Sequence, residues 1–568
     1  MKKPRLLLFL IITLAFTLRI YELGKNPSSL YWDEASLGYN AYTIATSGRD
    51  EHGEFFPPAR FIAFGDYKPP GYIYASVPSI LLFGLNEFSV RLPSMMAGVI
   101  MVIVTFFIVK ELFKKDTIAL LSSFLLAISP WSLQFSRAAF EANVAACFNL
   151  LGIYLFVLSK RKKWTILPSI IFFIFSFYTF NANRIIAPLI IIGLSLISAR
   201  SLWKNKIWFL SSLIIGLIFL YPSISYLSSR ESRIRFQEVS IFTNLEVIKL
   251  SNQRIAIDQN SLVSRIIHNR RILFAIDFLK HYFDNFTLRF LFTHGDVNPR
   301  LSLQDMGQLY IWELPFLILG IYLMVRRKEK GLLPLLIWLL IVPIPAGMAR
   351  ETPHALRITS ILPTYQIISA YGIYQFIIWI KNKSTGLRHS EALAEESRSS
   401  DRIITSRHKV GTRSFTSFRM TILIVICFLL TVNFYYYIHN YYIHYPINWS
   451  GEWQYGYKQM VEYVSQIEKN YDHIFVTDAL GRPYIYFAFY QKYPLENFLT
   501  ERKASRDWFG FWNVEELGKI KFRFDELNTA VGKILLVTTA GNLPDDFRLL
   551  STIKNLRGDD VFLIGEKV

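Results

Sequence analysis

Two adjacent carboxylates, Asp33 and Glu34, follow the first long apolar segment of the chain. At such a boundary they stay solvated, yet they lie close enough to lipid headgroups to act on a lipid-borne substrate. A carboxylate within hydrogen-bond reach of a hydroxyl can act as a general base and take its proton. We therefore take Asp33 and Glu34 as the candidate catalytic residues.

A reaction at a lipid phosphate also needs cations to stabilise the departing charge. Charged side chains lie within a few residues of several other predicted membrane boundaries, where they need partners, water or a ligand. The candidates for binding a donor phosphate or lipid are Lys68, Arg137, Arg184, Arg350, His354 and Arg357, and the secondary acidic candidates are Asp66 and Glu141.

Each candidate could also have an ordinary structural role. Asp33 and Glu34 could cap a helix that begins near Ala35, because Asp is a good N-cap and acidic residues favour the first turn. Arg137 and Glu141 are four residues apart and could form a helical ion pair. The remaining structural roles are a turn closed by Asp66, a snorkelling Lys68 and a local hydrogen-bond network around His354.

The composition indicates that membrane-spanning elements position these residues. Of 568 residues, 52% are hydrophobic and only 18% are charged, which favours an integral membrane protein. One crossing takes about 20 apolar residues. The sequence therefore predicts a polytopic α-helical membrane protein with about 11 transmembrane helices, at 6–18, 92–109, 118–133, 142–159, 164–182, 185–199, 207–229, 314–325, 331–349, 358–380 and 420–438.

The distribution of Lys and Arg predicts the orientation. The basic loops all fall inside if the apolar run 71–85 does not cross but lies on the outer face. The first outer loop, 23–91, with its juxtamembrane helices, and the large outer loop, 230–308, are then outside, and so is everything after Ile438. We expect a multi-pass protein of the plasma (inner) membrane whose active site faces the extracytoplasmic side.

Two segments differ from the transmembrane domain, which we assign to residues 1–440. Residues 383–419 are rich in Ser, Arg and Glu and predict a disordered cytoplasmic insertion. Residues 441–568 contain short apolar runs at 474–477, 534–537 and 561–564 that are typical of buried strands, with helical patterns between them. They predict a small C-terminal α/β domain on the extracytoplasmic side.

The N-terminal motifs form a recognisable set. It comprises Trp32-Asp33-Glu34-Ala35, the run from Asp66 to Tyr74 with Lys68-Pro69-Pro70 inside it, and the run from Leu82 to Ser94. Further matches lie at 129–141, 178–184, 307–310 and 353–357. The combination resembles glycosyltransferase family 39, which holds the protein O-mannosyltransferases and the aminoarabinose transferases that modify lipid A.

The resemblance implies a GT-C fold and an inverting glycosyltransferase that uses a polyprenyl-phosphate sugar donor and transfers a hexose or a pentose. Asp33 matches the position of the proposed base in the mannosyltransferases, and Lys68 resembles the residue that meets the lipid phosphate in the aminoarabinose enzymes. The expected partners are membrane lipid, the donor and an acceptor hydroxyl, which a glycan of the cell envelope, a lipid or a protein could supply.

The sequence leaves one competing function open, and it argues against nucleic-acid binding and an obligatory metal. A transporter or flippase for a lipid-linked sugar is the alternative, although such proteins place ionisable groups at the membrane midplane in repeated, broken helices. The net charge of +19 does not indicate nucleic-acid binding, because much of the excess lies in inner loops. We expect no obligatory metal, because the first outer loop holds no Asp-x-Asp, although Mg²⁺ or Mn²⁺ would suit carboxylate ligands.

Overall fold

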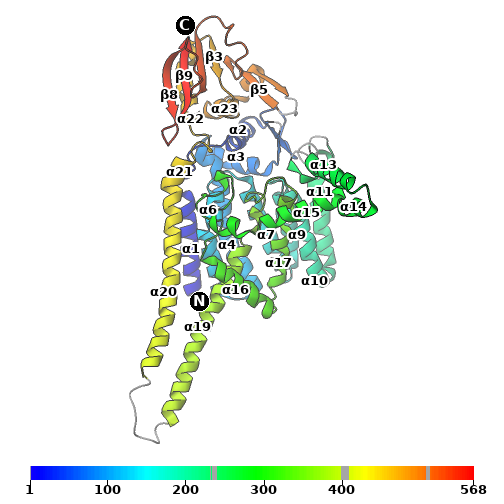
Figure 1. Ribbon diagram of the computed structural model, residues 1–568, viewed down its shortest axis with the longest axis vertical. Helices are drawn as coiled ribbons and strands as arrows, with labels where there is room; N and C mark the ends of the chain where they lie inside the picture. The colour runs from blue at the N-terminus through cyan, green and yellow to red at the C-terminus, as the bar shows by residue number, and fades with distance from the viewer. Residues whose placement is uncertain are drawn as a thin grey trace.

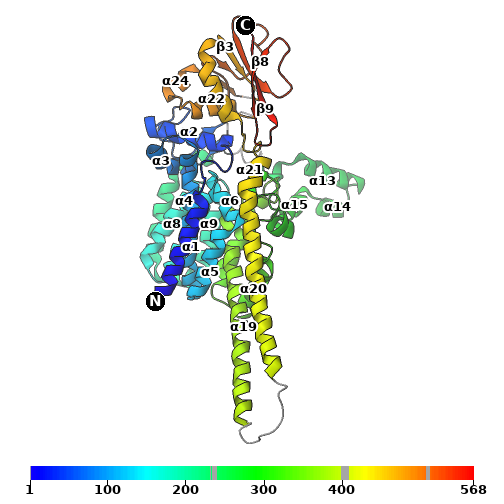
Figure 2. The same cartoon turned by 90° about the vertical axis from the view of Figure 1, so that its left-hand side faces the viewer.

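The computed structural model describes residues 2–64, 66–229, 232, 239–397, 409–506 and 512–567, and the side chains of residues 2, 3, 66, 381–397 and 409–423 are outside the described part. A helical bundle forms the middle of the molecule, and a β-sheet with its helices lies at one end (Figure 1). The helices α19 (Thr364–Ser397) and α20 (Lys409–His439) extend from the other end (Figure 2).

The bundle helices follow the apolar runs of the sequence, since each predicted run overlaps one helix or two consecutive helices. Helices suit apolar segments because all their backbone groups are bonded within the segment. Besides α19 and α20 they are α1 (Lys2–Ile20), α4 (Glu87–Phe113), α5 (Asp116–Ile128), α6 (Pro130–Ser136), α7 (Glu141–Leu158), α8 (Ile166–Phe177), α9 (Asn183–Ile197), α10 (Ala199–Lys204), α11 (Lys206–Leu227), α16 (Glu313–Arg326), α17 (Leu332–Ile341) and α18 (Ile344–Gly347).

Three of the described helices, α4, α7 and α11, are individually long and apolar enough to cross a membrane. The consecutive helices α5 and α6 together form a fourth candidate, bent by 57°. Helix α11 exposes large apolar side chains such as Leu217 and Ile218, at 65% and 66%. Such an exposed apolar face needs an apolar surrounding. The predicted number of about 11 spans stays a prediction.

The first outer loop lies between the bundle and the sheet (Figure 1). It contains α2 (Trp32–Ser47), the antiparallel strands β1 (Phe61–Ala63) and β2 (Asp66–Lys68), and α3 (Gly71–Phe83). The apolar run 71–85 is thus a helix, which packs against α2 and α4. Within this loop the chain turns back so that Lys68, at the end of β2, reaches α2.

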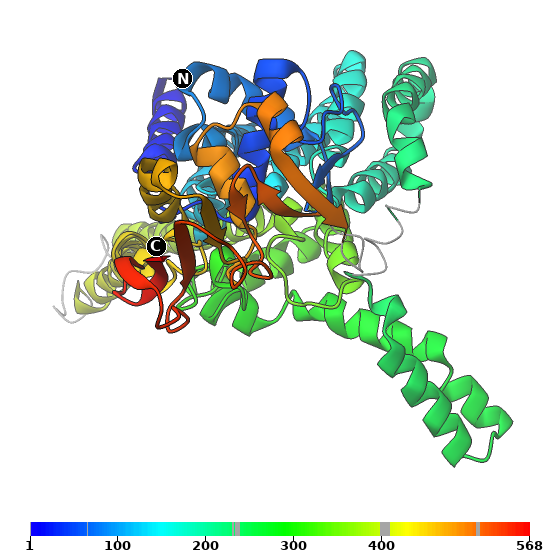
Figure 3. The ribbon, with the colours of Figure 1, turned by 90° about the horizontal axis from the view of Figure 1, so that it is seen from above.

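The large outer loop contains several short helices that project sideways from the bundle (Figure 3). Those that project are α13 (Leu245–Ile257), α14 (Leu262–Ile267) and α15 (Arg270–Asp284) (Figure 1). The loop also contains η2 (Ile241–Thr243), the π-helix η3 (Arg289–Thr293), which is buried against the bundle, and η4 (Pro299–Leu301). Residues 230, 231 and 233–238 of the predicted loop lie outside the described part.

The predicted insertion 383–419 is helical at both ends, where the sequence predicts disorder. Helix α19 continues to Ser397 and α20 begins at Lys409, while residues 398–408 lie outside the described residues. The sequence before Ser397 contains Ala, Leu and Glu, which are good helix formers, so a helix that leaves the bundle can continue through them.

The C-terminal part forms one sheet of seven strands in the order β4-β5-β6-β3-β7-β9-β8. Strand β3 is parallel to β6 and to β7, and the other pairs are antiparallel. The three predicted strands overlap β3, β7 and β9. The elements are α22 (Tyr457–Ile467), β3 (His473–Val476), α23 (Pro483–Tyr490), α24 (Leu495–Glu501), β4 (Arg502–Arg506), β5 (Trp512–Leu517), β6 (Ile520–Lys521), β7 (Ile534–Thr539), β8 (Arg548–Lys554) and β9 (Asp560–Lys567).

Short connecting helices complete the described chain. They are η1 (Lys163–Thr165), η5 (Thr359–Ile361), the π-helix η7 (Asn440–His444), α21 (Tyr445–Asn448) and η8 (Glu468–Asn470).

Candidate active site

Asp33 and Lys68 are 35 residues apart in the chain and form an ion pair. The Lys68 Nζ donates to Asp33 Oδ1 at 2.7 Å. The lysine side chain is 6% exposed, whereas the aspartate side chain is 41% exposed. One side of the Asp33 carboxylate is therefore fixed by a buried cation, and the other faces open space where a hydroxyl can approach. Residue Tyr31 occupies the N-cap of α2, so Asp33 lies in the first turn and does not cap the helix.

Glu34 has different surroundings from its neighbour. It is buried, and its two oxygens accept from Nε and Nη2 of Arg91, each at 3.1 Å. They also accept from the backbone N–H groups of Ala139, at 2.7 Å, and Tyr31, at 3.2 Å. Glu34 thus ties α2 to α4 and to the loop after α6, and its lone pairs are already used.

The Lys68 segment is held against the bundle by a glycine. The Gly71 N–H donates to the carbonyl oxygen of Tyr178 at 2.8 Å. A Cβ at position 71 would lie 2.2 Å from Thr179 Oγ1, a distance that no side chain tolerates. Only glycine allows this contact, and the contact sets where Lys68-Pro69-Pro70 leaves the bundle.

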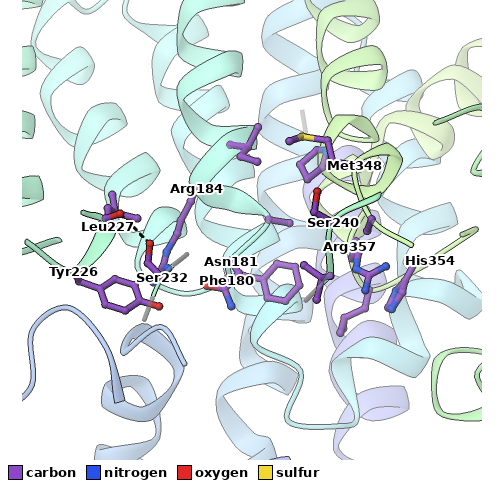
Figure 4. Close-up of a pocket in the computed structure, with 16 residues that line it drawn as sticks. Phe180, Asn181, Arg184, Tyr226, Leu227, Ser232, Ser240, Met348, His354 and Arg357 are labelled. Carbon is purple, nitrogen blue, oxygen red and sulfur yellow. Dashed lines mark hydrogen bonds between the residues drawn. The ribbon is translucent and has the colours of Figure 1, made fainter. Parts of the chain in front are cut away.

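Three of the predicted cationic or imidazole residues line one pocket, Arg184 on one side of it and His354 and Arg357 on the other (Figure 4). Figure 4 shows Arg184, from the start of α9, together with His354 and Arg357, from the loop before α19. The pocket has a volume of about 630 Å³, and most of its wall is apolar, with side chains such as Phe180 and Leu356. The Arg184 guanidinium lies over the Tyr226 ring, 5.1 Å from its centroid.

His354 faces this pocket as a neutral group. Burial, with the nearby Arg357 charge as a smaller cause, lowers the pKa of His354 to about 3. Its Nδ1 is buried and has no hydrogen-bond partner among the residues that the structure describes. At neutral pH the His354 imidazole therefore carries no charge, and it can form a hydrogen bond with a ligand.

Two contacts connect this pocket to the Asp33–Lys68 pair. Tyr67, which precedes Lys68, packs on the pocket residue Tyr226 with ring centroids 6.1 Å apart. The guanidinium of Arg300 lies 3.6 Å from the ring centroid of Tyr31, two residues before Asp33. The Arg300 charge also contributes to the lowered pKa of His354. The Asp33 carboxylate and the cations of the pocket therefore lie in adjoining parts of the structure.

Two of the predicted arginines lie elsewhere. Arg137 is buried and donates to the backbone oxygens of Leu18, Arg19 and Asn26. Arg350 donates to the Ser240 oxygen and to Thr243 Oγ1. Neither arginine lines the pocket, although Arg350 lies directly behind its lining residues Ser240 and Ala349.

The two secondary acids give no further site geometry. Glu141 begins α7, whereas Arg137 follows α6, so the two do not form an ion pair along one helix. The side chain of Asp66 lies outside the described residues.

Sequence reasoning missed a buried acid in the turn that follows α2. Glu51 is fully buried beside His52, and burial raises the pKa of its carboxyl to about 8. Arg502 of β4 donates to its backbone oxygen at 3.0 Å. Arg91 was also missed, although a charged residue next to an apolar run was a usable signal. Glu51 has no such signal, because burial by a distant strand leaves no local pattern.

No group of three or more His, Cys, Asp or Glu side chains with metal-binding geometry occurs among the described residues. The expectation that no metal is obligatory stays a prediction from the sequence.

Comparison with known proteins identifies relatives of the N-terminal part. Residues 9–220 match the family model for dolichyl-phosphate-mannose-protein mannosyltransferase. YkcB of Bacillus subtilis (strain 168), named as a candidate mannosyltransferase, is 29% identical over 215 residues. This match covers 36% of the present chain and 28% of YkcB. The predicted resemblance to family 39 is confirmed for this part of the chain.

Solved structures match over nearly the whole length. ArnT from Cupriavidus metallidurans in the apo state has a TM-score of 0.55 at 13% identity, covering 99% of this chain and 97% of ArnT. ArnT bound to undecaprenyl phosphate has a TM-score of 0.52 at 12% identity, covering 99% and 98%. The predicted GT-C fold is thereby confirmed.

Proposed function

We propose that this chain, whose N-terminal region matches the mannosyltransferase family model, is an inverting glycosyltransferase that moves a sugar from a polyprenyl-phosphate donor to an acceptor hydroxyl. The observation that carries the proposal is the Asp33–Lys68 pair, because it combines an accessible carboxylate with a buried cation at 2.7 Å. A polyprenyl-phosphate donor is consistent with the undecaprenyl phosphate in the solved ArnT structure.

The reaction is a single displacement. The acceptor oxygen attacks the anomeric carbon while Asp33 takes the hydroxyl proton, and the bond between that carbon and the phosphate oxygen breaks. The electron pair of the broken bond stays on the phosphate, where cations stabilise it. Attack opposite the leaving group inverts the anomeric configuration, and no covalent enzyme intermediate forms.

The donor occupies the pocket around Arg184. The guanidinium groups of Arg184 and Arg357 bind the donor phosphate, and the apolar wall of the pocket accepts the first part of the lipid chain. Lys68 orients the Asp33 carboxylate and supplies a further positive charge between base and phosphate. His354 is neutral and provides a hydrogen bond without adding charge.

The site faces the extracytoplasmic side of the inner membrane. The N-terminus and α10 lie at the opposite end of the bundle from α2 and the sheet (Figure 1). The basic residues Lys2, Lys3 and Arg5 and the basic α10 segment belong to the end that the distribution of charge places inside. The pocket, the Asp33–Lys68 pair and the sheet are then on the outer side.

Transfer by the purified protein tests this function. Polyprenyl-phosphate sugars of hexoses and pentoses are supplied with envelope glycans, lipids and proteins as acceptors, and products are identified by mass spectrometry and by anomeric NMR couplings. The proposal expects transfer from one donor with inversion. Transfer with retention, or movement of an intact lipid-linked sugar across vesicles without cleavage, would contradict it.

A further inference from the structure

The C-terminal sheet has a crevice at the place where open α/β sheets bind ligands. Strand β3 lies between β6 and β7, and both are parallel to it. After β3 the chain forms β6 on one side of β3 and β7 on the other side of β3. Ligands of open α/β sheets bind outside the carboxyl ends of the strands at such a switch point. The carboxyl ends of β3 and β6 lead directly to Asp478 and Arg523.

A cavity of about 630 Å³ occupies this crevice, and Asp478, Arg482, Asn513, Glu515 and Arg523 line it. A second cavity, of about 460 Å³, shares Asp478 and Arg523 with it. The two cavities therefore follow one edge of the sheet. Their combined size suits a ligand of more than one sugar-sized unit.

One wall of the cavity comes from outside the sheet. Trp32, the residue before Asp33, lines it. Gly481 has φ of +131°, and a Cβ there would lie 2.5 Å from the Trp32 ring. The backbone N–H of Trp32 donates to Gln454 Oε1 at 2.8 Å, and Gln454 Nε2 donates to the Leu480 oxygen at 2.8 Å. The cavity is thus joined to the first turn of α2, where the candidate base lies.

The lining indicates the chemistry of the ligand. Two carboxylates, Asp478 and Glu515, face two guanidiniums, Arg482 and Arg523, so the charges balance. Arg523 pairs with Glu515 at 2.9 Å. A polyanion would need an excess of cations. The lining also has apolar residues, among them Leu480, Pro483 and Val514, but the charged and amide groups between them interrupt the continuous apolar wall that a lipid tail needs. Planar polar groups that donate and accept, beside an indole ring, suit a neutral molecule with many hydroxyls.

We infer that this cavity is an acceptor subsite that binds a neutral saccharide unit and presents one of its hydroxyls to Asp33. The inference rests on the proposed function, because it names the acceptor class for the same reaction. It also selects a glycan or glycolipid acceptor over a protein. The indole of Trp32 packs against the apolar face of a sugar ring, while the charged and amide groups bond to its hydroxyls.

Direct binding tests this subsite without relying on transfer. Neutral oligosaccharides of mannose, glucose and N-acetylglucosamine are titrated into the full-length protein in detergent and followed by saturation-transfer NMR, with inorganic phosphate and an acidic peptide as further probes. We expect at least one neutral oligosaccharide to bind with a Kd that is roughly millimolar. The double variant Asp478→Ala/Arg523→Ala should weaken it about tenfold or more.

The control variant removes one acid and one base from another exposed part of the sheet domain. Asp545→Ala/Arg557→Ala should leave saccharide binding unchanged, because both side chains are exposed and lie outside the lining of the cavity. Absence of binding by every neutral saccharide, equal binding by the Asp478→Ala/Arg523→Ala variant, or binding of the peptide instead would overturn the inference. If saccharide binds as expected but no donor is ever cleaved, the subsite stands and the proposed transferase reaction fails.

Discussion

Asp33 and Glu34 are adjacent in sequence but have separate tasks. Asp33 has one oxygen on Lys68 and a partly exposed carboxylate, as a base that meets substrate requires. Glu34 is buried and holds the fully buried Arg91, whose remaining donors bond to backbone oxygens. The sequence identified the pair, and the family resemblance favoured Asp33 as the base. It could not show that Glu34 binds Arg91, because that contact joins residues 57 positions apart.

Glu34 is predicted to matter for stability. The Glu34→Gln variant leaves Arg91 buried without its counter-charge, so the free energy of unfolding should fall by about 3 kcal/mol or more. Denaturant unfolding in detergent, followed by tryptophan fluorescence, measures the change. Asp33→Asn is the matched comparison and should lower it by less, because the Asp33 side chain is 41% exposed, whereas both Glu34 and Arg91 are buried. Equal losses in both variants would contradict the division of roles.

Glu51 is predicted to make stability depend on pH. Its carboxyl has a pKa of about 8 in the folded protein, against 4.5 for an ordinary glutamate. Between these values the folded state holds a proton that the unfolded state has lost, so stability falls as pH rises from about 4.5 to 8.

The Glu51→Gln variant removes this dependence. Its free energy of unfolding relative to the natural chain should rise with pH across that window, by up to about 1.4 kcal/mol per unit. Unfolding curves at several pH values give this difference directly. His52 titrates in both proteins, so its effect largely cancels. A difference that stays constant from pH 5 to pH 8 would rule the prediction out.

At the scale of elements, the first outer loop positions the proposed base, Asp33, together with Lys68. The antiparallel strands β1 and β2 reverse the direction of the chain. Gly71 then fixes the start of α3 against Tyr178 and Thr179. The motif Lys68-Pro69-Pro70 was visible in the sequence, and so was the helix that follows. The contact of Gly71 with Tyr178 and Thr179, at the end of α8, could not be predicted, because these residues are more than a hundred positions apart.

Gly71→Ala tests this arrangement. The new Cβ would meet Thr179 Oγ1 at 2.2 Å and displace the Lys68 segment. We expect the kcat for transfer to fall by roughly tenfold to a hundredfold, because a shift of about 1 Å near reacting groups has effects of this size. Gly451→Ala is the matched control, since a Cβ there meets nothing within 4 Å. Full transfer by the Gly71 variant would show that this contact does not position the site.

The helices could be predicted from apolar runs, because helices in lipid bond their own backbone. The sequence could not show in the same way which arginines line the pocket. Arg137 and Arg350 have the same type and boundary position as Arg184 and Arg357, yet only the latter two line the pocket, although Arg357 also donates to the Glu351 backbone oxygen. A pattern of charges near membrane boundaries therefore gives a pool of phosphate-binding candidates, and only the packing selects among them.

At the scale of the whole molecule, the sheet lies on α2 and not apart from the bundle. Tyr486 of α23 donates to the Leu30 oxygen at 3.1 Å, and Gln454 bonds to Trp32. Three of the strands were predictable from short apolar runs. Their contact with α2 was not, since no local pattern records which surface a sheet covers.

The sidedness of the molecule can be measured by cysteine labelling in intact cells. In a Cys427→Ser background, Asp545→Cys lies on the sheet domain and Lys162→Cys on the loop between α7 and η1, and both positions are exposed. A membrane-impermeant maleimide should label position 545 and not 162 until the cells are permeabilised, because only the outer side is accessible. Labelling of 162 alone would invert the proposed orientation.

The measurement that tests the central claim most directly is sugar transfer by Asp33→Asn in purified protein. The amide keeps the size of the side chain but cannot take the acceptor proton, so transfer from the polyprenyl-phosphate donor should fall by about 100-fold to 10,000-fold. Donor binding, measured with the intact polyprenyl-phosphate sugar in the absence of acceptor, should remain. Transfer at the natural rate by Asp33→Asn, with folding and donor binding intact, would remove Asp33 from the mechanism.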